Sequence, residues 1–314
     1  MTETFRLLGD MGATHARLAL VAPDGAIAEE KIFETADYDR LEDVLGAYLG
    51  GLAAKPTEAA LGIAAPITGD IVQMVNCPWR FSLGALKQQF GWRRIYAVND
   101  FAANALCVPY LEAGDLVKIG EGEAAPGAAI AVVGPGTGLG VGGLVPHRGQ
   151  WAVIPGEGGN VTLAAMDGRE AALIDIVRRQ YAHVSAEQFL SGPGLVNLYD
   201  SLCELAGKPA GPLTPEHVTN LYPGCDPQCR EAVVIFCAML GTFAGDVALT
   251  LGARGGVYIM GGIVPKMLEV FRHSQFRERF EFKGRYRRYL EAIPTYVVIH
   301  ECPAFLGLRT LFED

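Results

Sequence analysis

The chain has 314 residues, a length that suits two domains or one large one. Half of the residues are hydrophobic and 19% are charged, which is the composition of a globular chain and excludes an intrinsically disordered one. The net charge is −9, and the one basic cluster, Lys283 to Arg288, lies among glutamates. Nucleic acid and anionic membranes are therefore not expected as partners.

The seven cysteines are odd in number, and the charged N-terminus lacks the features of a secretory signal. Free thiols in a reducing cytoplasm are the simplest interpretation. Cys225 and Cys229 are close in sequence, but no second pair completes a tetrahedral metal set. The uncharged stretch 124–146 is long enough for a membrane span, yet its seven glycines and three prolines predict two strands around a loop. We expect a cytoplasmic protein that does not enter a membrane.

The first third of the chain alternates strands and helices, which predicts a mostly parallel α/β core. A glycine turn, Asp10-Met-Gly12-Ala-Thr14, joins the first two strands, and the backbone amides of such a turn can face an anion. The Asn99-Asp100 pair lies where a strand meets an apolar helix. The expected elements are strands at 5–9, 16–22, 59–65 and 94–98, a helix over 82–90 with Ser82 as its cap, and a helix over 101–111.

A domain boundary is expected near residue 110, because the stretch 112–127 is rich in Gly, Ala and Glu. Ser185-Ala-Glu187-Gln188 fits a capping box. The pattern of strand, glycine turn and strand at 5–22 occurs again at 129–145. The other expected elements are strands at 128–133, to about 145, at 257–260 and at 295–299, and helices at 169–181, 232–251 and 265–273.

Two common nucleotide motifs do not account for the glycine loops. A Walker A loop requires Gly-Lys-Ser/Thr, and the sequence has no such triplet. Gly138, Gly140 and Gly143 match G-x-G-x-x-G, but Pro146 follows where a dinucleotide fold has a helix.

A third interpretation pairs the hairpin loops 10–14 and 134–138 around the phosphates of one nucleotide. Their amides and the hydroxyls of Thr14 and Thr137 would bind phosphate, and Asp10 would hold Mg²⁺ through water. Either loop alone could be an ordinary tight turn. The presence of both loops in this order favours a nucleotide-binding site over two ordinary turns.

Phosphoryl transfer to an alcohol needs a carboxylate beside the attacking hydroxyl. Asp100 lies at a strand-to-helix junction, where the helix dipole favours a negative charge, and it could accept the proton as general base. From the residues alone, Asp100 could equally be a plain helix N-cap.

The motifs together resemble the sugar kinases of the actin/Hsp70/hexokinase superfamily, and closely the bacterial glucokinase family outside the ROK group. The resemblance runs from end to end. The matching segments are Gly9-Asp10-Met-Gly12-Ala-Thr14-His-Ala-Arg17-Leu, Ala65-Pro-Ile-Thr-Gly69-Asp70, Asn99-Asp100-Phe, Gly134-Pro-Gly-Thr-Gly138-Leu-Gly-Val, Pro155-Gly-Glu157-Gly-Gly, Val184-Ser-Ala-Glu187, Leu190-Ser-Gly-Pro-Gly-Leu-Val-Asn-Leu-Tyr199 and Gly261-Gly-Ile-Val-Pro265.

The resemblance implies an ATP- and Mg²⁺-dependent glucokinase that forms glucose 6-phosphate, and a homodimer. It implies a two-lobed ribonuclease-H-like (actin-like ATPase) α/β fold with the active site in the cleft between the lobes. The small domain would span 1–110, with the tail 301–314 packed on it, and the large domain 111–300. Asp100 would be the catalytic base. The implied sugar ligands are Asn99, Asp100, Glu157, Asn160 and Glu187, and the implied nucleotide-binding residues are Gly9, Asp10, Met11, Gly12, Ala13, Thr14, Gly136, Thr137, Gly138, Gly261 and Gly262.

Simpler roles exist for the two glutamates: Glu157 could be an exposed loop acid, and Glu187 the third position of the capping box. The sequence also departs from the family at Asn160, where histidine is usual, and at Ala13 and His15 beside the phosphate loop. The shorter amide at 160 puts glucose affinity and sugar range in doubt.

Three other functions remain open. One is a kinase for another hexose, and a second is a non-catalytic sugar sensor, which would not need Asp10 or Asp100. The third is an ATPase switch of the actin or Hsp70 kind, which would leave Glu157 and Glu187 without a role.

Overall fold

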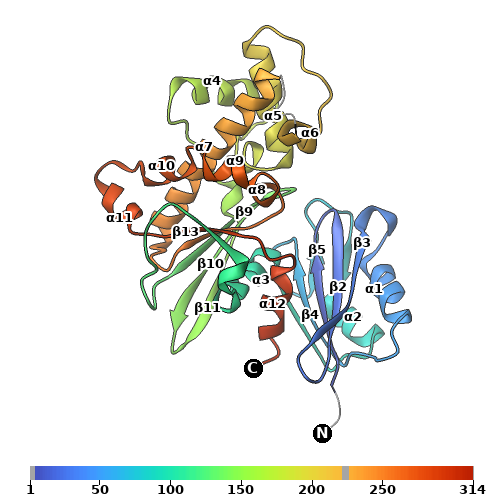
Figure 1. Ribbon diagram of the computed structural model, residues 1–314. Coiled ribbons are helices and arrows are strands. Elements are labelled where there is room, and N and C mark those ends of the chain that lie inside the picture. The colour runs from blue at the N-terminus through green and yellow to red at the C-terminus, as the bar shows by residue number, and fades with distance from the viewer. Residues whose placement is uncertain (1–3, 221–225, 314) are drawn as a thin grey trace. The chain divides into compact units, whose positions relative to one another are not determined.

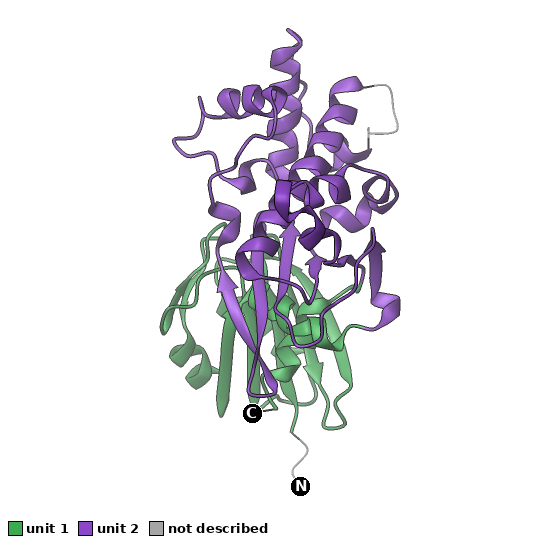
Figure 2. Cartoon of the chain, turned by 90° about the vertical axis from the view of Figure 1, so that its left-hand side faces the viewer, with its two compact units in different colours: residues 1–111, 300–314 green, residues 112–299 purple. Residues whose placement is uncertain are grey.

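The computed structural model describes residues 4–220 and 226–313. The chain divides into two compact units, residues 1–111 with 300–314 (unit 1) and residues 112–299 (unit 2), coloured separately in Figure 2. Each unit has a β-sheet with helices packed against it (Figure 1). Cys225, one half of the close cysteine pair, lies outside the described residues.

Unit 1 is built on a five-stranded sheet in the order β3-β2-β1-β4-β7. The first three strands form an antiparallel meander, while β1, β4 and β7 run parallel. All six residues of β4 are buried, as expected for a central strand that is covered on both faces. The strands of unit 1 are β1 (Arg6–Met11), β2 (His15–Val21), β3 (Ile27–Glu34), β4 (Glu58–Ile63), β7 (Arg94–Asn99) and a separate β5 (Ile71–Gln73) and β6 (Arg80–Ser82) pair.

Consecutive strand residues point to opposite sides of this sheet, and both sides carry apolar side chains that helices bury. Leu7 packs in the cluster that includes α1, whereas Leu8 packs with Phe305 and Leu308 from the C-terminal helix. The C-terminal segment thus completes the core of unit 1, with its helix packed against α3. The helices of unit 1 are α1 (Leu41–Gly50), α2 (Leu83–Gln89), α3 (Asp100–Cys107) and α12 (Pro303–Thr310).

Unit 2 repeats the five-strand arrangement of unit 1 and adds β8, antiparallel to β13, at its edge. Its sheet has the order β11-β10-β9-β12-β13-β8, in which β9–β11 form an antiparallel meander and β9, β12 and β13 run parallel. The repeated strand, glycine turn and strand pattern therefore marks the first hairpin of each unit. The strands of unit 2 are β8 (Leu116–Ile119), β9 (Ile130–Pro135), β10 (Leu139–His147), β11 (Gln150–Gly156), β12 (Val257–Ile259) and β13 (Thr295–Val298).

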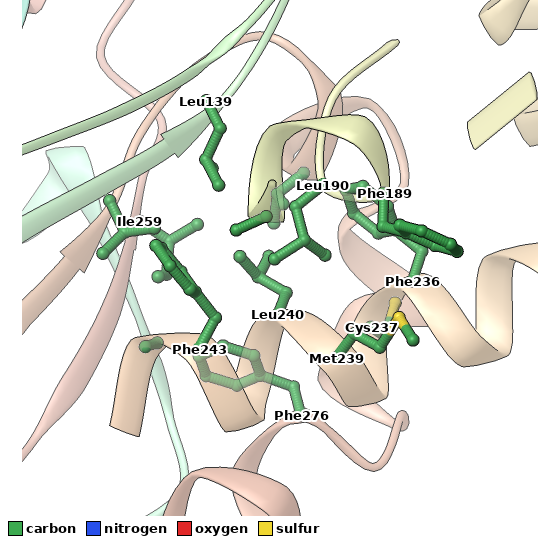
Figure 3. Close-up of a cluster of buried hydrophobic side chains, with 14 of the residues drawn as sticks. Leu139, Phe189, Leu190, Phe236, Cys237, Met239, Leu240, Phe243, Ile259 and Phe276 are labelled. Atoms are coloured by element: carbon green, nitrogen blue, oxygen red, sulfur yellow. The ribbon is translucent and has the colours of Figure 1, made fainter. Parts of the chain in front are cut away.

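A long apolar helix, α7, forms the centre of the unit 2 core. By length and composition it could cross a membrane, but 78% of its most apolar window is buried, as in a core helix of a soluble protein. Its side chains lie among Leu139, Leu190, Ile259 and Phe276 (Figure 3). The helices of unit 2 are α4 (Gly168–Val177), α5 (Gly192–Leu205), α6 (Pro215–Asn220), α7 (Pro227–Leu251), α8 (Ile263–Lys266), α9 (Leu268–Arg272), α10 (Phe276–Glu281) and α11 (Arg287–Glu291).

Most expected elements are confirmed within about five residues of their bounds. The expectation of a mostly parallel core is wrong, because each sheet combines an antiparallel meander with parallel strands. Two helices also differ in form. The helix expected over 265–273 is split into α8 and α9, because Met267 has a non-helical backbone, with φ −120° and ψ 32°. The helix expected over 101–111 ends at Cys107 and continues as a short 3₁₀ turn, 108–110. Proline at position 109 lacks the N–H that an α-helix would need there.

Candidate active site

The first hairpin of unit 1 carries an ion pair. Asp10 on β1 lies opposite Arg17 on β2, and Arg17 Nη1 donates to Asp10 Oδ2 over 3.1 Å. The Asp10 side chain is 18% exposed. Burial raises the pKa of its carboxyl above the ordinary value, and the charge and hydrogen bond of Arg17 offset part of that rise.

The turn after Asp10 is fixed from both sides. The Gly12 N–H donates to the His15 carbonyl over 3.0 Å, and Thr35 Oγ1 donates to the Gly12 carbonyl over 3.3 Å. The Thr35 N–H in turn donates to the Thr14 carbonyl over 2.9 Å. These contacts hold the predicted phosphate turn, of which Gly9, Met11 and Ala13 are the remaining members.

Asn99, not Asp100, is the N-cap of α3. Its Oδ1 accepts hydrogen bonds from the backbone N–H groups of Phe101 and Ala102, at 2.9 and 3.3 Å, and its Nδ2 donates to the Ala65 carbonyl over 3.4 Å. Asp100 is the first residue of the helix, and its Oδ1 also accepts from the Phe101 N–H, at 3.0 Å. The alternative role of Asp100 as a plain cap is therefore wrong, since Asn99 fills that position.

Asp10 and Asp100 lie near the same edge of the unit 1 sheet. The register aligns Asp10 with Gly62 on β4, and Gly62 with Val98 on β7. Two strand spacings of about 4.8 Å place the Asp10 and Val98 backbones about 10 Å apart. A Cβ on Gly62 would lie 3.2 Å from the Ala103 Cβ and 3.7 Å from the Asp100 Cα, so α3 packs on β4 with little room at this glycine. The carboxyl ends of parallel strands are where α/β sheets bind ligands.

In unit 2, the second predicted phosphate loop joins β9 to β10. The Gly136 N–H donates to the Gly138 carbonyl over 2.8 Å, and the Thr137 side chain is exposed. Gly261, at the end of the neighbouring strand β12, has φ +83°, and a Cβ there would lie 2.4 Å from the Pro135 carbonyl oxygen. The predicted adenosine segment, with its exposed Gly262, thus lies against the phosphate loop.

The two predicted sugar glutamates are near one another. Glu157 is exposed in the loop after β11, as the alternative role of a loop acid requires. Partial desolvation, and secondarily the negative charge of Glu187, raise the pKa of its carboxyl. Glu187 is half-buried and its Oε2 accepts the Leu139 N–H over 2.8 Å. The capping box exists, but its third position is Gln188, whose Oε1 accepts the Ser185 N–H. The alternative role of Glu187 as a capping residue is wrong, and its carboxylate faces the phosphate loop instead.

Asn160 ends a short 3₁₀ turn, Gly158–Asn160, that begins directly after Glu157. Its N–H donates to the Glu157 carbonyl over 3.0 Å, and its side chain is exposed. Among residues 4–220 and 226–313, none forms a hydrogen bond with the Asn160 side-chain amide. The amide can therefore serve a ligand.

A pocket of about 410 Å³ in unit 2 is lined by α7, β10, Ile154 of β11, and residues 156, 158 and 161–164 on either side of Glu157 and Asn160. Its walls are mainly apolar, with Asp246 as the one charged side chain. The lining contains none of the predicted sugar-binding or nucleotide-binding side chains.

Sequence reasoning assigned no role to Arg17, to the Leu139 N–H or to Gly192, whose N–H donates to the Gly136 carbonyl over 2.8 Å. Arg17 could have been found, because residues on either side of a hairpin turn pair in a fixed register. The Leu139 contact joins residues 48 apart in sequence, and no local pattern encodes it.

Comparison with known proteins agrees with this arrangement. The model of the Glucokinase family matches residues 7–314. A glucokinase from Nitrobacter hamburgensis is 47% identical over 309 residues, covering 98% of this chain and 96% of the relative. The chain belongs to the glucokinase family. It is an enzyme that phosphorylates D-glucose at the 6-hydroxyl with ATP.

Solved structures show the same fold. A glucokinase from an Antarctic psychrotroph is 36% identical, covers 99% of both chains and has a TM-score of 0.85. A ROK family glucokinase from Streptomyces griseus, solved in complex with glucose and AMPPNP, is 18% identical, covers 98% of both chains and has a TM-score of 0.69. The fold is that of the actin-like ATPases, as expected from the sequence.

Proposed function

We propose that Asp100 is the general base of the glucokinase reaction. Its carboxylate accepts the proton of the glucose 6-hydroxyl as that oxygen attacks the γ-phosphorus of ATP, and the bond from this phosphorus to the ADP oxygen breaks. The observation that carries this role is the capping of α3 by Asn99. Asp100 is not needed to cap the helix, and the helix N-terminus favours its charged form.

Asp10 is proposed to hold Mg²⁺ through water. Mg²⁺ usually keeps several waters and binds one or two carboxylates together with the phosphates of its nucleotide. Asp10 fits this requirement, because it is a carboxylate next to the predicted phosphate turn. Its Oδ2 accepts from Arg17, which fixes the orientation of the carboxylate. The bound ion would neutralise charge on the phosphates. Within the described residues no group of three or more His, Cys, Asp or Glu side chains could hold a metal ion.

The sugar hydroxyls are assigned to Asn99, Asp100, Glu157, Asn160 and Glu187, because carboxylates and amides can accept from and donate to hydroxyls. Asn99 contributes only through Nδ2, since its Oδ1 caps α3. The phosphates of ATP are assigned to the turns 9–14 and 136–138, and its adenosine to Gly261 and Gly262. The ROK family neighbour that binds glucose and AMPPNP supports a sugar and a nucleotide on this fold.

Another hexose is the second candidate substrate, and the exposed amide of Asn160, where the family has histidine, favours considering it. We also propose a homodimer in the cytoplasm. The dimer rests on the family resemblance, and the compartment on the six described cysteines, all of which are free thiols.

ADP release measured with glucose, mannose, glucosamine and no sugar tests the proposal. We expect turnover with glucose to exceed that with the other sugars, and little turnover without sugar. Faster turnover with another hexose would reassign the substrate, and equal turnover with and without sugar would contradict a sugar site altogether.

A further inference from the structure

One segment of unit 2, residues 187–192, holds the phosphate loop at both ends. The Gly192 N–H donates to the carbonyl of Gly136, at the start of the loop, over 2.8 Å. Glu187 Oε2 accepts the N–H of Leu139, directly after the loop, over 2.8 Å. The predicted sugar ligand and the predicted phosphate loop are therefore joined by a charge-assisted hydrogen bond.

The contact between Glu187 and the loop is tight. A Cβ built on Gly138 would lie 2.5 Å from Glu187 Oε2 and 3.3 Å from its Cδ. A Cβ on Gly136, in the same loop, would meet no atom within 4 Å. Neither glycine has a left-handed backbone, so the difference between the two positions is the Glu187 carboxylate.

We propose that Glu187 is a positioning residue for the phosphate loop as well as a sugar ligand, and that it couples glucose binding to ATP binding. The inference rests on the proposed sugar role of Glu187. A glucose hydroxyl that donates to this carboxylate restricts its rotamers while Oε2 stays on the Leu139 N–H. The loop is then ordered before ATP arrives, so each ligand strengthens the binding of the other.

The negative charge of Glu187 could instead act mainly by repelling the phosphates of ATP. The variants Glu187→Ala and Glu187→Gln separate these effects, because glutamine loses the charge and keeps an oxygen for the Leu139 N–H. Positioning predicts that alanine weakens nucleotide binding and that glutamine restores it. Repulsion predicts that both variants bind nucleotide more tightly.

The nucleotide arm measures the Kd of Mg-AMPPNP by calorimetry, with and without glucose. In the Glu187→Ala variant we expect Kd without glucose to rise about tenfold or more, as for loss of a hydrogen bond to a charged group. Saturating glucose should tighten AMPPNP binding in the wild type and leave it unchanged in this variant. Glu278→Ala is the control: it removes an exposed carboxylate of unit 2 that has no proposed role in binding, and should leave the Kd of AMPPNP unchanged.

The sugar arm measures the Kd of glucose without nucleotide. Gly138→Ala should displace the Glu187 carboxylate and weaken glucose binding about fivefold or more, although residue 138 belongs to the ATP loop. Gly136→Ala should change glucose Kd less than about twofold, because its methyl group meets no neighbour. In a Glu187→Ala background, Gly138→Ala should have no further effect on glucose Kd.

The outcomes test the proposed sugar site and the proposed coupling separately. If Glu187→Ala leaves glucose Kd unchanged, Glu187 is not a sugar ligand and the proposed sugar site is wrong. If Glu187→Ala weakens glucose binding but Gly138→Ala does not, the sugar site stands and the coupling is wrong. If Gly138→Ala fails to fold, as judged by its thermal transition, the AMPPNP measurements on Glu187→Ala and Glu187→Gln still decide the proposal.

Discussion

Asp10 and Arg17 face each other across the first hairpin of unit 1, joined by an ion pair of 3.1 Å between Asp10 Oδ2 and Arg17 Nη1. Burial raises the pKa of Asp10, and Arg17 limits the rise. Because the proposed role of Asp10 requires its charged form, Arg17 keeps the residue active at lower pH. In the proposed mechanism Arg17 thus acts through Asp10.

Replacing Arg17 with glutamine should raise the pKa of Asp10 further. The acidic limb of the kcat/KM profile should then move to higher pH, while Arg17→Lys should keep it near its wild-type position. The folded Arg17→Gln variant should also hold the Asp10 proton more tightly than the wild type does. Its free energy of unfolding should therefore fall, as pH rises, over a wider pH range that runs from the ordinary aspartate pKa to the raised pKa of folded Asp10. Profiles that superimpose for wild type and Arg17→Gln would show that the pair does not control Asp10.

Glu157 offers a test through stability. Its raised pKa, caused by partial desolvation and then by the charge of Glu187, means that the folded protein favours the protonated form. The stability that this proton contributes is lost as pH rises through the raised pKa. Glu157→Gln should therefore have a Tm slightly above that of the wild type at neutral pH, by an amount that solvent screening at this exposed residue keeps small, and a similar Tm at about pH 4, where glutamate is protonated. Glu278→Gln, which removes one charge from an exposed site in unit 2, is the control. A lower Tm for Glu157→Gln at neutral pH would contradict this account.

Replacing Asn160 with histidine, the usual residue of the family at this position, tests whether residue 160 contacts the sugar. Its side chain is exposed and the next residue, Val161, is 51% exposed, so a histidine has room. Asn160→His adds a longer donor beside Glu157 and should lower KM for glucose about twofold to tenfold, the worth of one hydrogen bond. KM for ATP at saturating glucose should change little. Steady-state kinetics with glucose, mannose and glucosamine check this, and identical constants for every sugar would remove residue 160 from the site.

Two helical glycines in unit 1 make opposite predictions. A Cβ on Gly307 of α12 would lie 1.9 Å from the Ala103 carbonyl oxygen on α3, whereas a Cβ on Gly46 of α1 would meet nothing within 4 Å. Gly307→Ala should cost about 1–3 kcal/mol through overpacking. Gly46→Ala should stabilise by about 0.5–1 kcal/mol, because alanine loses less backbone freedom than glycine on folding. Urea denaturation of both variants measures this, and two changes of the same sign would show that α12 does not pack on α3 as described.

Short sequence patterns predicted the features that are formed by residues close together in the chain. The glycine turns, the two first hairpins and the Ser82 cap of α2, whose Oγ accepts the Ala85 N–H over 3.0 Å, were all found from short patterns. Short patterns could not decide whether Asn99 or Asp100 caps α3, because either side chain can accept the same N–H groups.

The family resemblance implied that the tail 301–314 packs on the small domain, but the residues alone did not predict which long-range contacts form. The packing of α12 beside α3, and the hydrogen bond between Glu187 and Leu139, join distant segments through the fold alone. The break between α8 and α9 lies at Met267, two residues after Pro265, and the sequence pattern did not predict it there. Such features depend on packing, which overrides local helix preference.

The rate of phosphoryl transfer by Asp100→Asn tests the central claim most directly. Asparagine keeps the shape and an oxygen for the Phe101 N–H, so the thermal transition and the glucose Kd should stay close to those of the wild type. It cannot accept the proton of the 6-hydroxyl, and kcat at saturating glucose and ATP should fall about 10²–10⁴-fold or more. A variant that binds glucose normally and keeps more than about half of the wild-type kcat would show that Asp100 is not the base, since loss of general-base catalysis removes far more than that.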